Sequence, residues 1–143
     1  MATLTLRQAV FARLTGDETI AGLVAERVYP HLAPQKAARP YLTYLVVSGE
    51  HVSHLRAAAG LVMHRVQIDC WADTYAGAEA LVEAVRGAFD GLRGTIAARF
   101  TAKSIHLAGE TEGYEPPAHG GEAGIYRVTL ELEIWHAESV PTA

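Results

Sequence analysis

The chain has 143 residues and a mass of 15.4 kDa, a size that predicts one domain, residues 1–143, with enough surface to bury a core. Half of the residues are hydrophobic and a fifth are charged, which excludes a disordered, collagen-like or low-complexity chain. The formal net charge of −4 argues against a free-standing DNA-binding domain, because such domains carry a basic face. The chain shows neither a signal-peptide pattern nor an apolar run of membrane length, so we expect a soluble, cytosolic protein without a membrane partner.

Two short helices are predicted at the N-terminus. Apolar residues recur there at helical spacing, and Thr3 is a candidate cap for the first helix. Asp17 is a candidate cap for a second helix over 18–25. Residues 27–30 then form a short extended piece that ends at a proline, and the proline-containing segment 31–40 is predicted to be an ordered connector.

Two strands are predicted next, over 41–50 and 61–73, because both segments are rich in β-branched and aromatic residues. In the second strand apolar side chains alternate with mostly polar ones, as in an antiparallel sheet that is covered on one side. The link at 51–60 is longer than a tight turn needs, which suits contacts with another molecule. On the apolar face, we expect His64 to be a hydrogen-bonded core histidine and Cys70 to be a buried, inert thiol.

An amphipathic helix follows, with Thr74 as its candidate cap. Strands are predicted over 105–112 and 125–136, separated by a loop rich in glycine and proline, and residues 137–143 form a frayed tail. The order is α-α-β-β-α-β-β. It indicates an α+β domain in which a four-stranded, mostly antiparallel sheet has helices packed on one face.

Patterns for cofactors and metals are weak. His51 and His54 are close together, but no further ligand lies at a matching short offset, so no metal site is predicted. The glycines near the C-terminus do not form a phosphate-binding motif, and the arginines are dispersed rather than interleaved with aromatic residues. We therefore predict no cofactor and no sequence-specific binding of nucleic acid.

A catalytic pair of carboxylates is the remaining possibility for enzyme chemistry. Glu131 and Glu133 are predicted to share one face of a strand, as an acid–base pair would. Arg65 and Arg127 are expected to neutralise them across the sheet, and no nucleophile accompanies them. The prediction is that the protein is not an enzyme.

Charge is distributed unevenly along the chain. Residues 109–143 hold seven acidic side chains and one arginine, whereas residues 1–108 hold nine acidic and eleven basic ones. The C-terminal segment therefore carries −6 and the remainder +2. Such a split is typical either of a surface that faces a particular partner or of a solvated acidic face, and the sequence leaves both open.

Two tryptophans, Trp71 and Trp135, are predicted on the outward faces of their strands. Outward aromatic side chains are enriched at protein interfaces. They are equally compatible with packing under the connector of residues 28–40.

Several segments together resemble one protein family over residues 4–136. They are RVYP at 27–30, AP at 33–34, RPYLTY at 39–44, RVQIDCWA at 65–72, the helix with Ala78, Leu81, Val85 and Arg86, and YRVTLELEIWH at 126–136. Their order resembles the tail completion, or tail terminator, proteins of long-tailed bacteriophages and related phage-like particles.

The resemblance implies a structural role without catalytic residues. Such proteins form a ring, usually a hexamer, at the head-proximal end of the tail tube, where the ring stops polymerisation and meets the head connector while DNA passes through its lumen. For this chain the resemblance implies self-association, contacts with a tail tube protein and with a head–tail connector or stopper protein, and a place in the virion after synthesis in a bacterial cytoplasm. The alternatives are another morphogenesis protein, such as a connector or tube subunit, and a small enzyme or ligand-binding domain.

By position, the resemblance makes the loops at 50–60 and 109–124 candidates for contacts between subunits or with the tube. An acidic C-terminal half that lined the lumen would repel DNA phosphates and let the duplex slide. The candidate interface residues are His51, His54, Arg56, Trp71, Glu110, Glu112, Tyr114, Glu115 and Trp135.

Overall fold

The computed structural model describes residues 4–53, 58–89, 94–97, 100–117 and 124–137. The mixed α+β class with three helices is confirmed, and two short strands join the elements that the sequence predicted. In chain order the elements are α1 (Leu6–Gly16), α2 (Glu18–Val24), β1 (Val28–Pro30), β2 (Tyr41–Ser53), β3 (Ala58–Ala72), α3 (Tyr75–Phe89), β4 (Gly94–Ala97), β5 (Phe100–Glu115) and β6 (Ile125–Ala137).

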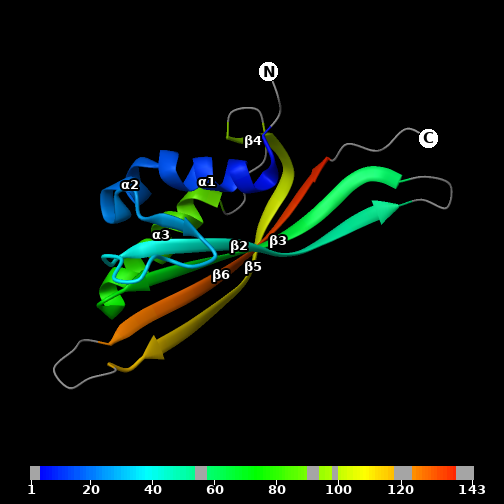
Figure 1. The fold of residues 1–143 in the computed structure, drawn as a ribbon. Coiled ribbons are helices and arrows are strands. Elements are labelled where there is room, and N and C mark those ends of the chain that lie inside the picture. The colour runs from blue at the N-terminus through cyan, green and yellow to red at the C-terminus, as the bar shows by residue number, and fades with distance from the viewer. Residues whose placement is uncertain (1–3, 54–57, 90–93, 98–99, 118–123, 138–143) are drawn as a thin grey trace.

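The strands form one six-stranded sheet in the order β1-β2-β3-β6-β5-β4 (Figure 1). The β1–β2 pair is parallel, and the other neighbours are antiparallel. The predicted sheet of four strands is therefore wrong in number, although it was right to be mostly antiparallel. The additional strands β1 and β4 have three and four residues, too few to show an alternating pattern in the sequence.

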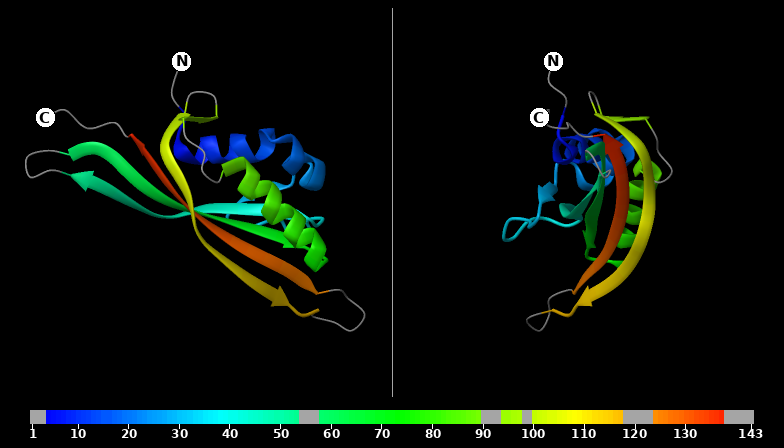
Figure 2. Two further views of the ribbon diagram at one scale, coloured as in Figure 1. Left: turned by 180° about the vertical axis from the view of Figure 1, so that it is seen from behind. Right: turned by 90° about the vertical axis from the view of Figure 1, so that its right-hand side faces the viewer.

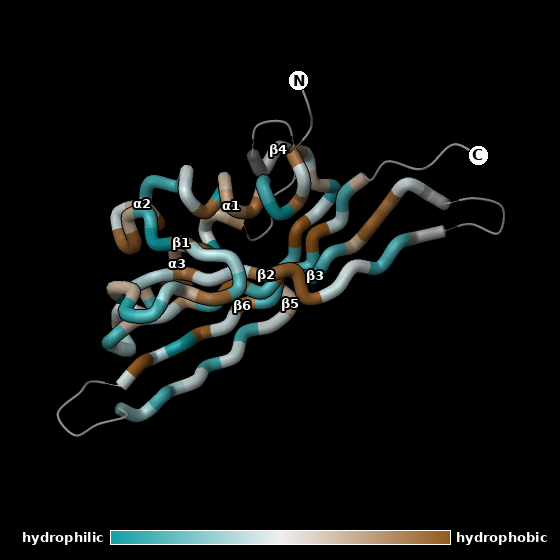
Figure 3. Tube along the Cα trace, viewed as in Figure 1, coloured by the Kyte–Doolittle hydropathy of each residue, from teal (hydrophilic) through white to brown (hydrophobic). Residues whose placement is uncertain are grey.

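All three helices lie on one face of the sheet, as predicted (Figure 2). Along β6, hydrophobic and hydrophilic residues alternate (Figure 3). The buried positions Val128, Leu130, Leu132 and Ile134 share one face of the strand and belong to the core under the helices. The hydrophobic core fills the space between the two layers. Its largest fully buried side chains include Leu14, Ile20, Leu42, Ile68, Leu81, Phe89, Leu130, Leu132 and Ile134.

Side-chain caps fix the beginnings of the helices. Thr5, rather than the predicted Thr3, caps α1, because its hydroxyl accepts from the Gln8 backbone N–H while the Gln8 side chain accepts from the Thr5 N–H. Asp17 caps α2 and Thr74 caps α3, as predicted. Each accepts a hydrogen bond of 3.0 Å from the backbone N–H three residues later.

The strands of both long hairpins extend further than the sequence predicted. The strands β2 and β3 continue into the predicted link at 51–60, and β5 begins at Phe100. Pairing with the neighbouring strand overrides the low strand propensity of alanine, glycine and serine there. As a result the β2–β3 and β5–β6 hairpins project past the helix layer in opposite directions (Figure 1).

The C-terminal end of the sheet is only partly described. Ala137, the first residue of the predicted frayed tail, still belongs to β6, and the rest of that tail lies outside the described residues. No helix in the described part of the chain is long and apolar enough to cross a lipid bilayer.

Candidate interface surfaces

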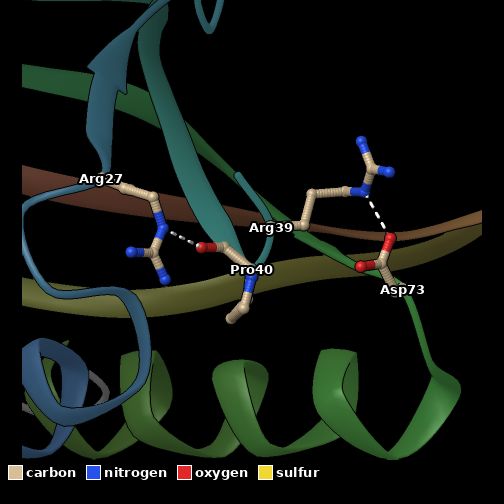
Figure 4. Close-up of polar contacts among 4 residues, drawn as sticks. All are labelled: Arg27, Arg39, Pro40 and Asp73. Atoms are coloured by element: carbon tan, nitrogen blue, oxygen red, sulfur yellow. Dashed lines mark hydrogen bonds and ion pairs between the residues drawn. The ribbon is translucent and has the colours of Figure 1, made fainter. Parts of the chain in front are cut away.

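The segment between β1 and β2 is held at its base by two arginines (Figure 4). The Nε of Arg27 donates to the carbonyl oxygen of Pro40 at 2.9 Å, and the Nε of Arg39 donates to Oδ1 of Asp73 at 2.6 Å. The backbone N–H of Leu42 also donates to the Arg27 carbonyl at 3.0 Å. These bonds fasten both ends of the connector to the sheet, so the segments around 27–30 and 39–44 have a clear structural role.

The sheet face opposite the helices carries a row of aromatic side chains across neighbouring strands. The Tyr29 ring meets Tyr41 edge-on at a centroid distance of 5.9 Å, and Tyr41 stacks on Trp71 at 5.8 Å. The Arg127 guanidinium lies 5.3 Å from the centre of the Trp71 ring, a cation–π contact. The Trp71 indole N–H donates to the Thr43 hydroxyl at 3.0 Å. Trp71 therefore packs against side chains of β2 and β6 on the open face of the sheet, and the interface role of the two tryptophans stays a prediction.

Glu131 and Glu133 lie on this same open face and are neutralised across the sheet. Arg65 contacts Glu133 at 2.8 Å and Glu131 at 4.0 Å, as the sequence predicted. Arg127 was expected to neutralise them too, but it stacks on Trp71 instead. The two carboxylates are thus engaged in ion pairs rather than presented as an acid–base pair.

The nucleophile and histidine predictions concern the neighbouring strand β3. Cys70 is fully buried, and burial raises the pKa of its thiol, which agrees with the predicted inert cysteine. His64 lies on the same face, and its Nδ1 is 2.8 Å from Nε2 of His136. The Nδ1 of His136 is 2.9 Å from the Ala137 carbonyl oxygen, so that nitrogen donates. His64 is a hydrogen-bonded histidine at the edge of the core, as predicted.

An acidic groove of about 220 Å³ lies between α3 and the β5–β6 pair. The Tyr75 hydroxyl donates to Glu112 at 2.5 Å, and this hydrogen bond is the main cause that raises the pKa of Tyr75. Among the residues that the structure describes, no group of histidine, cysteine and acidic side chains is placed to hold a metal ion. The groove is lined by Tyr75, Glu79, Val82, Glu83, Glu110, Glu112 and Val128.

The acidic side chains of the C-terminal segment do not gather on one surface. Glu110 and Glu112 line the groove on the helix side of the sheet. Glu131 and Glu133 lie on the opposite face and are paired with Arg65. The two sets of acidic side chains therefore lie on opposite faces of the sheet.

The predicted interface residues are dispersed over the two hairpins. His51 belongs to β2, while His54 and Arg56 lie outside the described residues. Tyr114 is 52% exposed, and Trp135 is half-buried on the open face of the sheet. The fold brings Glu110, Glu112 and Tyr114 together on the helix side of β5, whereas Glu115, two residues past Gly113, alternates to the open face.

The sequence did not predict a second hollow, of about 370 Å³, beside α1 at the β1–β2 edge of the sheet. Phe11 is 40% exposed there, and its ring lies 6.1 Å from that of Tyr44. No local pattern marks this hollow, because its walls come from three separate elements. The lining residues are Arg7, Gln8, Phe11, Pro30 and Tyr44.

Comparison with known proteins is informative at the level of family and of fold. The family model described as Tail completion protein gp17 matches residues 8–137. Among solved structures, a chain from the virion of a native gene transfer agent (GTA) particle has a TM-score of 0.71 at 22% identity, covering 92% of this chain and 94% of that chain. A search of curated proteins gave no significant match.

Proposed function

The chain belongs to the tail completion protein gp17 family, and from this membership we propose that it closes into a hexameric ring at the head-proximal end of a tail tube. There the ring ends tube polymerisation and joins the tail to the head–tail connector or stopper protein. The family match over residues 8–137 is the observation that carries the proposal. It makes the chain a structural component of a phage or phage-like tail and its partners other virion proteins.

The edges of the sheet support a ring made of identical subunits. A closed ring repeats one head-to-tail contact, so each subunit needs two different and complementary surfaces. One edge of this sheet is β1 with the exposed part of β2, and the other is β5 with the short β4. Within the described residues, β4 covers β5 only at Phe100–Ala102, which leaves the outer side of β5 available for most of its length.

The projecting hairpins are suited to reach neighbouring rings of the particle. We infer that the β2–β3 hairpin, with His51 and the predicted contacts His54 and Arg56, meets one axial partner. The β5–β6 hairpin, with Glu115, meets another. The half-buried Trp71 and Trp135 would contribute through the open sheet face, with DNA passing through the lumen without sequence-specific contacts.

The direct test is to add the purified chain to tail tubes while they are growing. A terminator caps tube ends, so we expect growth to stop and the lengths seen by electron microscopy to become shorter as more protein is added. Light scattering at several concentrations gives the mass of the species that acts. An open-ended size distribution, or incorporation along the tube, would instead indicate a tube subunit.

A further inference from the structure

We propose that the hollow beside Arg7 binds the opposite edge of a second copy of this chain, an inference that rests on the proposed ring. The hollow is the one formed by α1, β1 and β2. Its occupant is the surface formed by Tyr75, Glu110, Glu112 and Tyr114, here called the tyrosine–glutamate edge.

The hollow has the composition of a docking site for an aromatic and acidic surface. Phe11, Pro30 and Tyr44 make its walls largely apolar, and Phe11 stays 40% exposed although it touches Tyr44. Arg7 also lines it and forms no ion pair with any residue that the structure describes. A partner that covers the aromatic rings and brings a carboxylate would satisfy both features.

The tyrosine–glutamate edge offers that complement. Tyr75 and Tyr114 are 53% and 52% exposed, although both rings pack on Tyr126, at 5.8 Å and 4.8 Å. That packing holds two large side chains in place, so less conformational entropy is lost when a partner covers them. Glu112 accepts from Tyr75 and Glu110 lines the same groove, so negative charge lies directly beside the rings.

A second copy is the occupant because the two surfaces lie at opposite edges of one sheet, β1–β2 and β5 (Figure 2). Their charges are opposite, so the hollow of one copy attracts the edge of the next. A two-fold contact of the hollow with itself would place Arg7 against Arg7, which is repulsive. The head-to-tail arrangement uses each surface once per subunit and continues around a ring.

Charge reversal tests the contact in solution. We expect Arg7→Glu and Glu112→Arg each to raise the self-association Kd on the order of tenfold or more, because each places like charges together. The doubly substituted chain restores opposite charges and should return to within about threefold of the wild type. Lys103→Glu is the matched control, since it makes the same charge change at an exposed position of β5 about 30 Å along the strand from Glu112. Sedimentation velocity at several concentrations gives each Kd.

Cross-linking keeps the test independent of any folding defect in those variants. Copies with Phe11→Cys are mixed with copies with Tyr114→Cys and treated with a short bismaleimide, and we expect mixed dimers to exceed dimers of either variant alone. Equal or lower yield of the mixed dimer would overturn the inference. A doubly reversed chain in which the two losses simply add would also overturn it. So would a wild type that stays monomeric in sedimentation velocity at every concentration.

The tube-capping assay separates this inference from the proposed function. If wild type and Arg7→Glu stop tube growth equally well, the contact is wrong and the terminator function stands. If the wild type does not stop tube growth, the proposed function fails whatever the self-association shows.

Discussion

At the scale of single residues, Cys70 illustrates how position suppresses reactivity. Its side chain is fully buried, and burial raises the pKa of the thiol, with further contributions from Asp69 and Glu110. The thiolate is the form that reacts with alkylating reagents. We therefore expect iodoacetamide to label the native protein on the order of a hundredfold more slowly than the urea-unfolded chain. Mass spectrometry of timed samples gives both rates, and similar rates would mean that the thiol is accessible in the fold.

Gly49 is the glycine whose missing side chain matters most for the histidine pair. A Cβ at this position would lie 2.8 Å from two ring atoms of His64, and that ring is hydrogen-bonded to His136. We expect Gly49→Ala to lower the free energy of unfolding by about 1–3 kcal/mol, because the ring must move.

Gly87→Ala is the matched control in α3, where nothing lies within 4 Å of the added methyl group. Alanine is the better helix former, so this change should raise the free energy of unfolding by about 0.5–1 kcal/mol. Urea titrations of both variants measure the difference. Equal changes in the free energy of unfolding at the two sites would show that the His64 ring moves aside without destabilising the fold.

At the scale of elements, Asp17 lies where α1 ends and α2 begins, so its cap determines the bend between them. Its carboxylate accepts from the Ile20 N–H at 3.0 Å. Asp17→Ala should cost about 1 kcal/mol of stability, whereas Asp17→Asn keeps an acceptor and should cost only a few tenths. Thermal unfolding of the two variants separates the two causes. If loss of the negative charge were responsible, Asp17→Ala and Asp17→Asn would be equally destabilised.

The elements with strong periodicity were predictable and their ends were not. The helix α3 and the strand β6 each have a long apolar pattern, and both occur where the sequence placed them. The predicted cap of the first helix was Thr3, whereas the observed cap is Thr5. The additional strands β1 and β4 were not predicted as strands. Short segments and strand ends depend on a partner strand, and that partner is distant in the sequence.

At the scale of the whole molecule, the candidate surfaces depend on which elements pack together. In the sequence, the seven acidic residues of segment 109–143 form one negatively charged group. Strand alternation separates them, because Glu110 and Glu112 lie on the helix side of the sheet and Glu131 and Glu133 on the open face. The hollow beside Arg7 was missed because α1, β1 and β2 each contribute part of its walls. The pairing of Arg65 with the two glutamates was predictable, because it follows from adjacent strands and strand parity alone.

Three tyrosines make the free energy of unfolding depend on pH in the alkaline range. The pKa of Tyr44 is raised by burial, that of Tyr41 by burial with a further contribution from Glu115, and that of Tyr75 mainly by the hydrogen bond to Glu112. Each tyrosine therefore holds its proton more tightly in the folded chain than in the unfolded chain, whose tyrosines ionise near pH 10. The folded state binds more protons above that pH, so stability must fall as pH rises through 10 and beyond.

Urea unfolding at a series of pH values between neutral and strongly alkaline measures this loss. We expect constant stability from the tyrosines below about pH 9 and a progressive decline above about pH 10. Tyr44→Phe removes one of the three groups without removing the ring, so its decline should be shallower than that of the wild type. If the two curves remained parallel, the burial of the Tyr44 hydroxyl would not contribute to the alkaline loss. The alkaline loss of stability would then be attributed first to Tyr75, whose hydroxyl donates to Glu112 at the proposed subunit contact.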